Sequence, residues 1–162
     1  VNIKPIEGVK LININTADEM LNEVKALISN TDIFIGCAAV ADFKPIDFHK
    51  SKIKKDHNDE MSLKLIKNPD ILQYASDHMK EKLVIGFSAE TDNVIENAKI
   101  KLLKKNLNMI ICNDVSNKEI GFDSDNNEVH LITLDDVVKL TKTSKLKIAK
   151  QIIKSIEALI AN

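Results

Sequence analysis

Apolar residues gather in six short runs, and segments with a helical period separate them. The runs cover residues 9–14, 33–39, 63–66, 83–87, 109–112 and 129–134. Three of them contain uninterrupted apolar stretches, Ile33-Phe34-Ile35, Leu83-Val84-Ile85 and Met109-Ile110-Ile111-Cys112. Continuous runs are typical of strands that are covered on both faces in a parallel sheet. Strands that alternate with helices in this way predict an α/β architecture.

Four segments have the apolar spacing of amphipathic helices. A Thr16–Glu19 capping box opens the first, which extends through about Ser29. Asn68-Pro69 supplies a side-chain cap and then a proline at the first helical position of the second, which extends through about Lys80. The third covers about residues 93–105 and the fourth about 144–161. We expect the apolar face of each helix to lie in the core.

Two segments fit neither period. Residues 43–60 contain Pro45, three Asp, two His and five Lys within 18 residues, which is too polar to pack and long for a connection. We expect this segment to be a lid, a binding loop or disordered. Residues 121–127 are rich in turn formers and lead into a strand, which predicts an edge strand or a hairpin.

Length and charge narrow the classes of partner. The chain has 162 residues, 44% of them apolar, which suits one domain. The formal net charge is -1, so no long-range field attracts nucleic acid or an anionic membrane. All 23 basic residues are Lys, so an anion site has to use ammonium groups, backbone N–H groups and helix ends. No apolar run approaches the length of a membrane span, and no signal peptide opens the chain.

The four glycines lie at least 28 residues apart, at Gly8, Gly36, Gly86 and Gly121. This spacing excludes a Walker P-loop, a GxGxxG dinucleotide motif and a GxSxG nucleophile elbow within the chain. Cys37 and Cys112 lie in apolar runs, and no Cys or His spacing is typical of zinc. We expect buried structural thiols in a reducing compartment and no metal site made by the protein.

Ligand sites of parallel α/β sheets lie beyond the carboxyl ends of the strands. Four segments that follow predicted strands are therefore candidate ligand sites. Small residues at 36–43 would admit a ligand or simply allow tight packing. Residues 50–55 carry four lysines, which suits an anion or a solvated loop. Residues 67–71 could present helix N–H groups to a phosphate or form an ordinary cap. The fourth segment, residues 86–91, precedes Lys101 and Lys105, which share a helix face. Together they describe a polyphosphate pocket.

Six motifs in this order, AAVADFKP, KIKK, KNPDIL, GFSAET, KLLKKN and GFDSDNNEVHLI, resemble the phosphopantothenate-cysteine ligase family. This family is the synthetase half of the bifunctional coenzyme A biosynthesis flavoprotein of bacteria. The resemblance covers about residues 9–160. It implies a three-layer, Rossmann-like, doubly wound and mostly parallel sheet with a β-hairpin extension, and residues 1–162 as a single ligase domain. It also implies a cytoplasmic enzyme that joins 4'-phosphopantothenate to L-cysteine through an acyl-cytidylate made from CTP.

The resemblance assigns roles to individual residues. Lys52 matches the catalytic lysine that neutralises the phosphates, with Lys54 and Lys55 assisting it. Asp42 would bind a ribose hydroxyl, the base or the metal, and these alternatives stay open. The remaining nucleotide contacts implied by the motifs are Gly36, Cys37, Ala38, Asn68, Pro69, Asp70, Ile71, Phe87, Lys101 and Lys105. Mg²⁺ would accompany the triphosphate, held mainly by its phosphates.

The family also implies parts that this sequence does not contain. A glycine-rich segment is expected before Val1, and the decarboxylase domain, which would carry FMN, is expected further upstream. Members form homodimers, and residues 121–132, with an exposed strand edge, are a candidate for the contact. The alternative is a nucleotide-binding fragment without activity. A Rossmann oxidoreductase is disfavoured because the phosphate-binding glycines are missing.

Overall fold

The computed structural model describes residues 6–47, 61–115 and 124–161, which divide into two compact units. Unit 1 consists of Val1–Leu27 and Val40–Ile71, and unit 2 consists of Ile28–Ala39 and Leu72–Asn162. Each unit contains its own sheet. A two-stranded sheet belongs to unit 1 and a five-stranded sheet belongs to unit 2.

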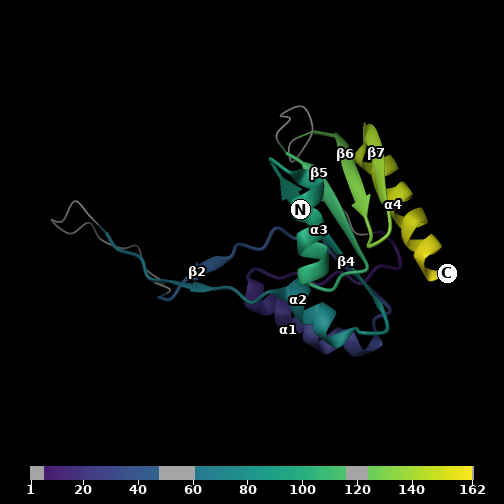
Figure 1. Cartoon of the computed structure of the whole chain (residues 1–162). Coiled ribbons are helices and arrows are strands. Elements are labelled where there is room, and N and C mark those ends of the chain that lie inside the picture. Colours follow the sequence, from purple (N-terminus) through teal and green to yellow (C-terminus); the bar gives the residue numbers. More distant parts are fainter. Residues whose placement is uncertain (1–5, 48–60, 116–123, 162) are drawn as a thin grey trace. The chain divides into compact units, whose positions relative to one another are not determined.

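The sheet of unit 2 has the order β1-β4-β5-β6-β7 (Figure 1). Its strands are β1 (Ile33–Gly36), β4 (Leu83–Glu90), β5 (Met109–Asp114), β6 (Asn126–Ile132) and β7 (Val137–Ser144). The strands β1, β4 and β5 are parallel, and β6 is antiparallel to both of its neighbours. Four of the five strands therefore share one direction, and the prediction of an α/β fold with a mostly parallel sheet is confirmed.

Helices cover both faces of this sheet. On one face, α2 (Ile71–His78) contributes Ala75 and α3 (Val94–Lys104) contributes Ala98 and Leu102 to a buried cluster with Ile110. The helix α4 (Lys145–Ile160) lies on the other face (Figure 1). Three of its isoleucines pack against residues of β4, β5 and β6. The sheet therefore lies between two layers of helices, which gives the three predicted layers. The continuous apolar runs of β4 and β5 contribute side chains to both buried clusters.

The helix ends match the sequence prediction for α3 and α4 but not for α2. At the start of α4, the Ser144 hydroxyl accepts a hydrogen bond from the Lys147 N–H at 3.4 Å. The prediction that Asn68 caps α2 is wrong, because the helix begins only at Ile71. The side-chain amide of Asn68 instead donates to the Ala41 carbonyl at 2.8 Å. A hydrogen bond to the neighbouring strand connection has replaced the cap.

Unit 1 contains α1 (Ala17–Leu27) and the antiparallel pair β2 (Phe43–Pro45) and β3 (Leu65–Lys67). The 3₁₀ turn η1 (Ile28–Asn30) follows α1 and opens unit 2. The capping box is present, since the Glu19 N–H donates to the Thr16 hydroxyl at 3.1 Å. The Glu19 carboxylate accepts from the N–H of Asn15 at 2.6 Å. However, α1 has no buried residue, so the expected core face is wrong for this helix.

Three further predictions are corrected. Residues 9–14 form no strand, and Val9 and Leu11 are exposed, because alternation without a neighbouring strand leaves the backbone hydrogen bonds unmet. Residues 126–132 form β6, an inner strand between β5 and β7, so the expected exposed edge is wrong, whereas the expected hairpin exists between β6 and β7. Residues 121–123 lie outside the described part. Cys112 is buried as expected, but Cys37 is exposed.

Candidate functional site

Two glycines lie side by side in the sheet, one at the carboxyl end of β1 and one in the middle of β4. Gly36 and Gly86 are partners in the parallel register. A Cβ atom at Gly86 would lie 2.9 Å from methyl groups of both Leu72 and Leu107, and one at Gly36 would lie 3.2 Å from Leu72 and from Phe34. The lack of a side chain at Gly36 and Gly86 therefore lets α2 pack closely on the sheet, and the fit is tighter at Gly86. The approach of Leu72 and Phe34 to Gly36 fits the packing alternative, and the nucleotide contact assigned to Gly36 stays a prediction.

The chain leaves the sheet directly after Gly36. Cys37 and Ala38 follow as exposed residues, so their backbone is accessible from solvent. Groups around the Cys37 thiol remove enough water to raise its pKa, although the residue as a whole is exposed. The thiol therefore stays protonated at neutral pH and is unsuited to be a thiolate nucleophile.

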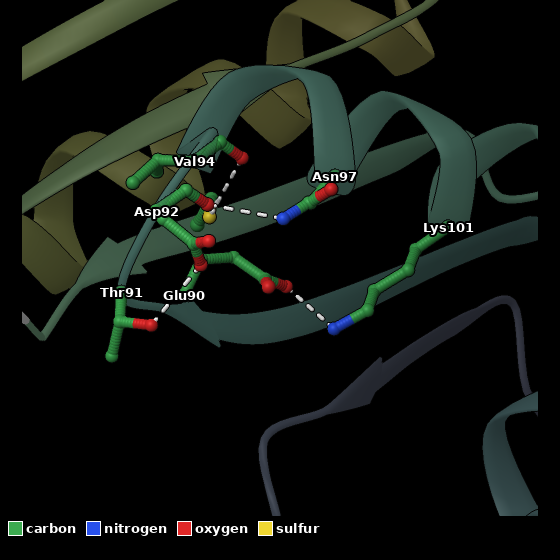
Figure 2. Close-up of polar contacts among 7 residues, drawn as sticks. Glu90, Thr91, Asp92, Val94, Asn97 and Lys101 are labelled. Atoms are coloured by element: carbon green, nitrogen blue, oxygen red, sulfur yellow. Dashed lines mark hydrogen bonds and ion pairs between the residues drawn. The ribbon is translucent and has the colours of Figure 1, made fainter.

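The end of β4 presents its side chains to opposite faces of the sheet. Phe87 packs against the cluster that includes the α4 isoleucines. Glu90, three residues later, points to the other face and binds Lys101 of α3, with 2.5 Å between Nζ and Oε1 (Figure 2). The structure therefore separates the side chains of Phe87 and Lys101, which the sequence placed in one pocket, by the thickness of the sheet.

Sequence reasoning did not assign a role to Glu90, although it lies inside the GFSAET motif. Its side chain is only 11% exposed, whereas that of Lys101 is 48% exposed. Lys105 ends α3, and its N–H donates to the Lys101 carbonyl. The signal in the sequence was the alternation of the strand, because Gly86, Ser88 and Glu90 share the face on which α3 packs.

The start of α3 is fixed to the β4–α3 connection and to β5. The amide of Asn97 donates to the Asp92 carbonyl at 3.0 Å, and the Cys112 thiol lies 3.6 Å from the Val94 carbonyl (Figure 2). Asn93 takes a left-handed conformation with φ of 44° at the turn into the helix. The N–H groups of the first turn of α3 are thereby held close to the end of β4.

In unit 1 the structure brings together two predicted residues. The Asn68 N–H donates to the Asp42 carbonyl at 2.8 Å, which extends the β2–β3 pairing by one step. The Oδ1 atom of Asn68 is buried and has no hydrogen-bond partner among the described residues. Asp42 itself is exposed. An acceptor and a carboxylate are therefore adjacent at the base of this strand pair.

The other predicted residues of this unit follow or interrupt the strand pair. Lys52, Lys54 and Lys55 lie between β2 and β3 in the sequence and outside the described residues. Pro69 is half-buried, Asp70 is exposed, and Ile71 is 5% exposed at the first position of α2. Unit 1 thus holds Asp42 and residues 68–71, whereas unit 2 holds residues 36–38, Phe87, Lys101 and Lys105.

No cluster of three or more His, Cys, Asp or Glu side chains suited to a metal ion occurs within the described ranges. The helices that the structure describes include none with the length and apolarity needed to cross a membrane.

The comparisons with known proteins place the whole chain in one family. Residues 1–160 match the family described as "DFP: DNA/pantothenate metabolism flavoprotein C-terminal domain". The chain is 43% identical over 150 residues to the coenzyme A biosynthesis bifunctional protein CoaBC of Borreliella burgdorferi, covering 91% of this chain and 37% of that protein. It is 46% identical over 132 residues to CoaBC of Escherichia coli K12, covering 78% and 32%.

A solved structure agrees with this assignment. The crystal structure of the C-terminal domain of CoaBC superposes with a TM-score of 0.80 at 32% identity, covering 99% of this chain and 70% of that one. The chain spans less than half the length of the CoaBC proteins it matches. The family match over nearly every residue and the identity to several CoaBC proteins show that the chain belongs to the DNA/pantothenate metabolism flavoprotein C-terminal domain family.

Proposed function

We propose that the protein containing this chain joins 4'-phosphopantothenate to L-cysteine, with CTP as the activating nucleotide, in coenzyme A biosynthesis. The observation that carries the proposal is the family match over residues 1–160, together with 43% identity to a CoaBC protein. The six sequence motifs that resemble the phosphopantothenate-cysteine ligases lie within the same residues.

The reaction has two transfers. The carboxylate of phosphopantothenate attacks the α-phosphate of CTP, and pyrophosphate leaves. The amine of cysteine then attacks the acyl carbon, CMP leaves, and the amine loses a proton. Negative charge develops on phosphate and carbonyl oxygens in both steps, so aligned positive groups and N–H donors are the main contribution of the protein. Mg²⁺ enters with the triphosphate.

The described residues offer groups suited to this task. Lys101 places an ammonium group at the end of β4, near the first turn of α3, where helix N–H groups favour anions. Asn68 carries a buried acceptor oxygen that the described residues leave unmatched. The neighbouring Asp42 is exposed, so a ribose hydroxyl or a base amino group could donate to its carboxylate.

The test is pyrophosphate release by the full-length protein, measured with CTP in the presence and absence of phosphopantothenate. Lys52→Ala should lower the dependent rate about 100-fold, because it removes a charge directed at the phosphates. Lys150→Ala is the matched control, since Lys150 lies exposed on α4. A Lys52→Ala rate equal to that of the parent protein would reject the role of the basic segment.

Substitution of ATP for CTP in the same assay tests the choice of nucleotide. Calorimetric titration of this 162-residue chain with MgCTP tests the alternative of a binding module. Affinity without turnover, in both the chain and the full-length protein, would favour a nucleotide-binding role and count against the ligase. A homodimer remains part of the proposal, and a monomeric mass by light scattering would count against it.

A further inference from the structure

The ion pair between Glu90 and Lys101 is asymmetric in its exposure. The carboxylate is almost covered, with 11% of the side chain exposed, and the lysine is half exposed at 48%. The Nζ–Oε1 distance of 2.5 Å shows a direct charge-assisted hydrogen bond (Figure 2). One end of the pair therefore belongs to the protein interior and the other end to the solvent side.

The fold dictates this meeting. Glu90 is the last residue of β4 and points to the face covered by α3. Lys101 lies two turns into α3, and helical side chains lean toward the helix N-terminus, so its ammonium reaches back to the strand end. Asn97 lies one turn earlier on the same helix face and binds the Asp92 carbonyl. Both side chains thus hold the connection from β4 to α3.

The cost of burying a charge differs between Glu90 and Lys101. A covered carboxylate without a cation is costly, so Glu90 requires Lys101. A half-exposed lysine needs no such partner. An ammonium group has three N–H donors, and the bond to Glu90 uses one, so further donors remain for an anion that approaches from solvent.

We propose that Glu90 is a positioning residue that holds the Lys101 ammonium at the end of β4, ready to bind the nucleotide phosphates. This inference rests on the proposed function. A free lysine side chain would lose rotamer freedom when it binds a phosphate, and Glu90 removes most of that cost before the nucleotide arrives. The role requires an acceptor oxygen at residue 90, which glutamine also provides.

The experiment measures kcat and KM for CTP in pyrophosphate release by the full-length protein. Glu90→Ala should raise KM for CTP about 10-fold and change kcat less than about 3-fold. Glu90→Gln should stay within about 3-fold of the parent in both constants. Lys101→Met should raise KM at least as much as Glu90→Ala, because it removes the ammonium group itself, and the double variant should be no worse than Lys101→Met alone, because Glu90 acts through Lys101. Exposed Glu96→Ala and Lys99→Ala on the same helix serve as controls and should leave KM unchanged.

The outcomes separate this inference from the proposed function. Absence of phosphopantothenate-dependent pyrophosphate release by the parent protein overturns both. Normal turnover of the parent with an unchanged KM for Glu90→Ala overturns the positioning role alone. Glu90→Gln as impaired as Glu90→Ala also overturns it, because charge rather than anchoring would then matter. Thermal denaturation of each variant checks folding. Where Glu90→Ala fails to fold, Glu90→Met carries the test, because methionine fills the covered space without offering an acceptor oxygen, and an unchanged KM for this variant overturns the positioning role.

Discussion

Gly86→Ala is expected to destabilise the chain by about 1–2 kcal/mol. The added Cβ would lie 2.9 Å from methyl groups of Leu72 and Leu107, whereas carbon atoms in contact prefer about 3.5–4.0 Å. Each methyl group would have to retreat by about 0.6 Å or more. Leu107 is only 4% exposed, so the retreat is into packed core. Overpacking of this kind costs about 1–3 kcal/mol. Alanine also lowers the conformational entropy of the unfolded chain, which offsets about 0.4–1 kcal/mol of that cost.

Urea unfolding of the 162-residue chain measures this cost. Gly36→Ala is the matched comparison, because it is the register partner and its Cβ would meet side chains only at 3.2 Å. It should cost less than Gly86→Ala, under about 1 kcal/mol. A free energy of unfolding for Gly86→Ala within about 0.5 kcal/mol of the parent would refute the packing role. A larger loss for Gly36→Ala than for Gly86→Ala would refute the ranking by contact distance.

Two further predictions concern stability. Leu102→Ala should cost about 2–5 kcal/mol in urea unfolding, because Leu102 is 1% exposed in the core under α3. Leu103→Ala, at 65% exposure, should stay within about 0.5 kcal/mol, and equal losses would contradict the assigned helix face. The hydrogen bond from Lys139 lowers the pKa of Glu128 below its ordinary value of 4.5, so this pair stabilises the fold above that pH. The denaturation midpoint of the parent should therefore be slightly higher than that of Glu128→Gln at pH 7. The difference between the two midpoints should vanish as the pH falls below 4.5. A constant difference from pH 7 to pH 3 would contradict the assignment.

The buried strands of unit 2 were predictable because their own composition carries the signal. β4 and β5 are covered on both faces, so their side chains are apolar whichever way they point, and the sequence shows this as an uninterrupted run. The apolar stripe of α4 is equally explicit, since Ile148, Ile152 and Ile156 recur every four residues and all are buried. Burial at these positions can therefore be predicted from the local sequence, without knowing which distant residues pack against them.

Strands at the margins were not predictable in this way. Among the described residues β7 pairs with β6 alone, and five of its eight positions are polar, so neither a run nor a clear alternation marks it. β2 has three residues and ends in Pro45, which the sequence placed in an irregular segment. Residues 9–14 show the reverse error, because their apolar alternation describes a strand that has no neighbour in the described part of the chain. Pairing is a property of two segments, and one segment does not reveal it.

In the candidate site, too, some features could be predicted from the local sequence and others could not. The motif containing Gly86 was identified from its place after an apolar run, but the need for a small residue at Gly86 comes from the approach of Leu72 and Leu107, which no local pattern contains. The Glu90–Lys101 pair was closer to being predictable. Alternation along β4 puts Glu90 on the face of Gly86, and a helix that follows a strand after three residues returns over one face of the sheet. A covered carboxylate at that place demands a cation, and Lys101 is the lysine whose side chain leans back to it. Counting strand parity toward the carboxyl end, and then asking which cation the next helix can supply, would have identified this contact before the structure did.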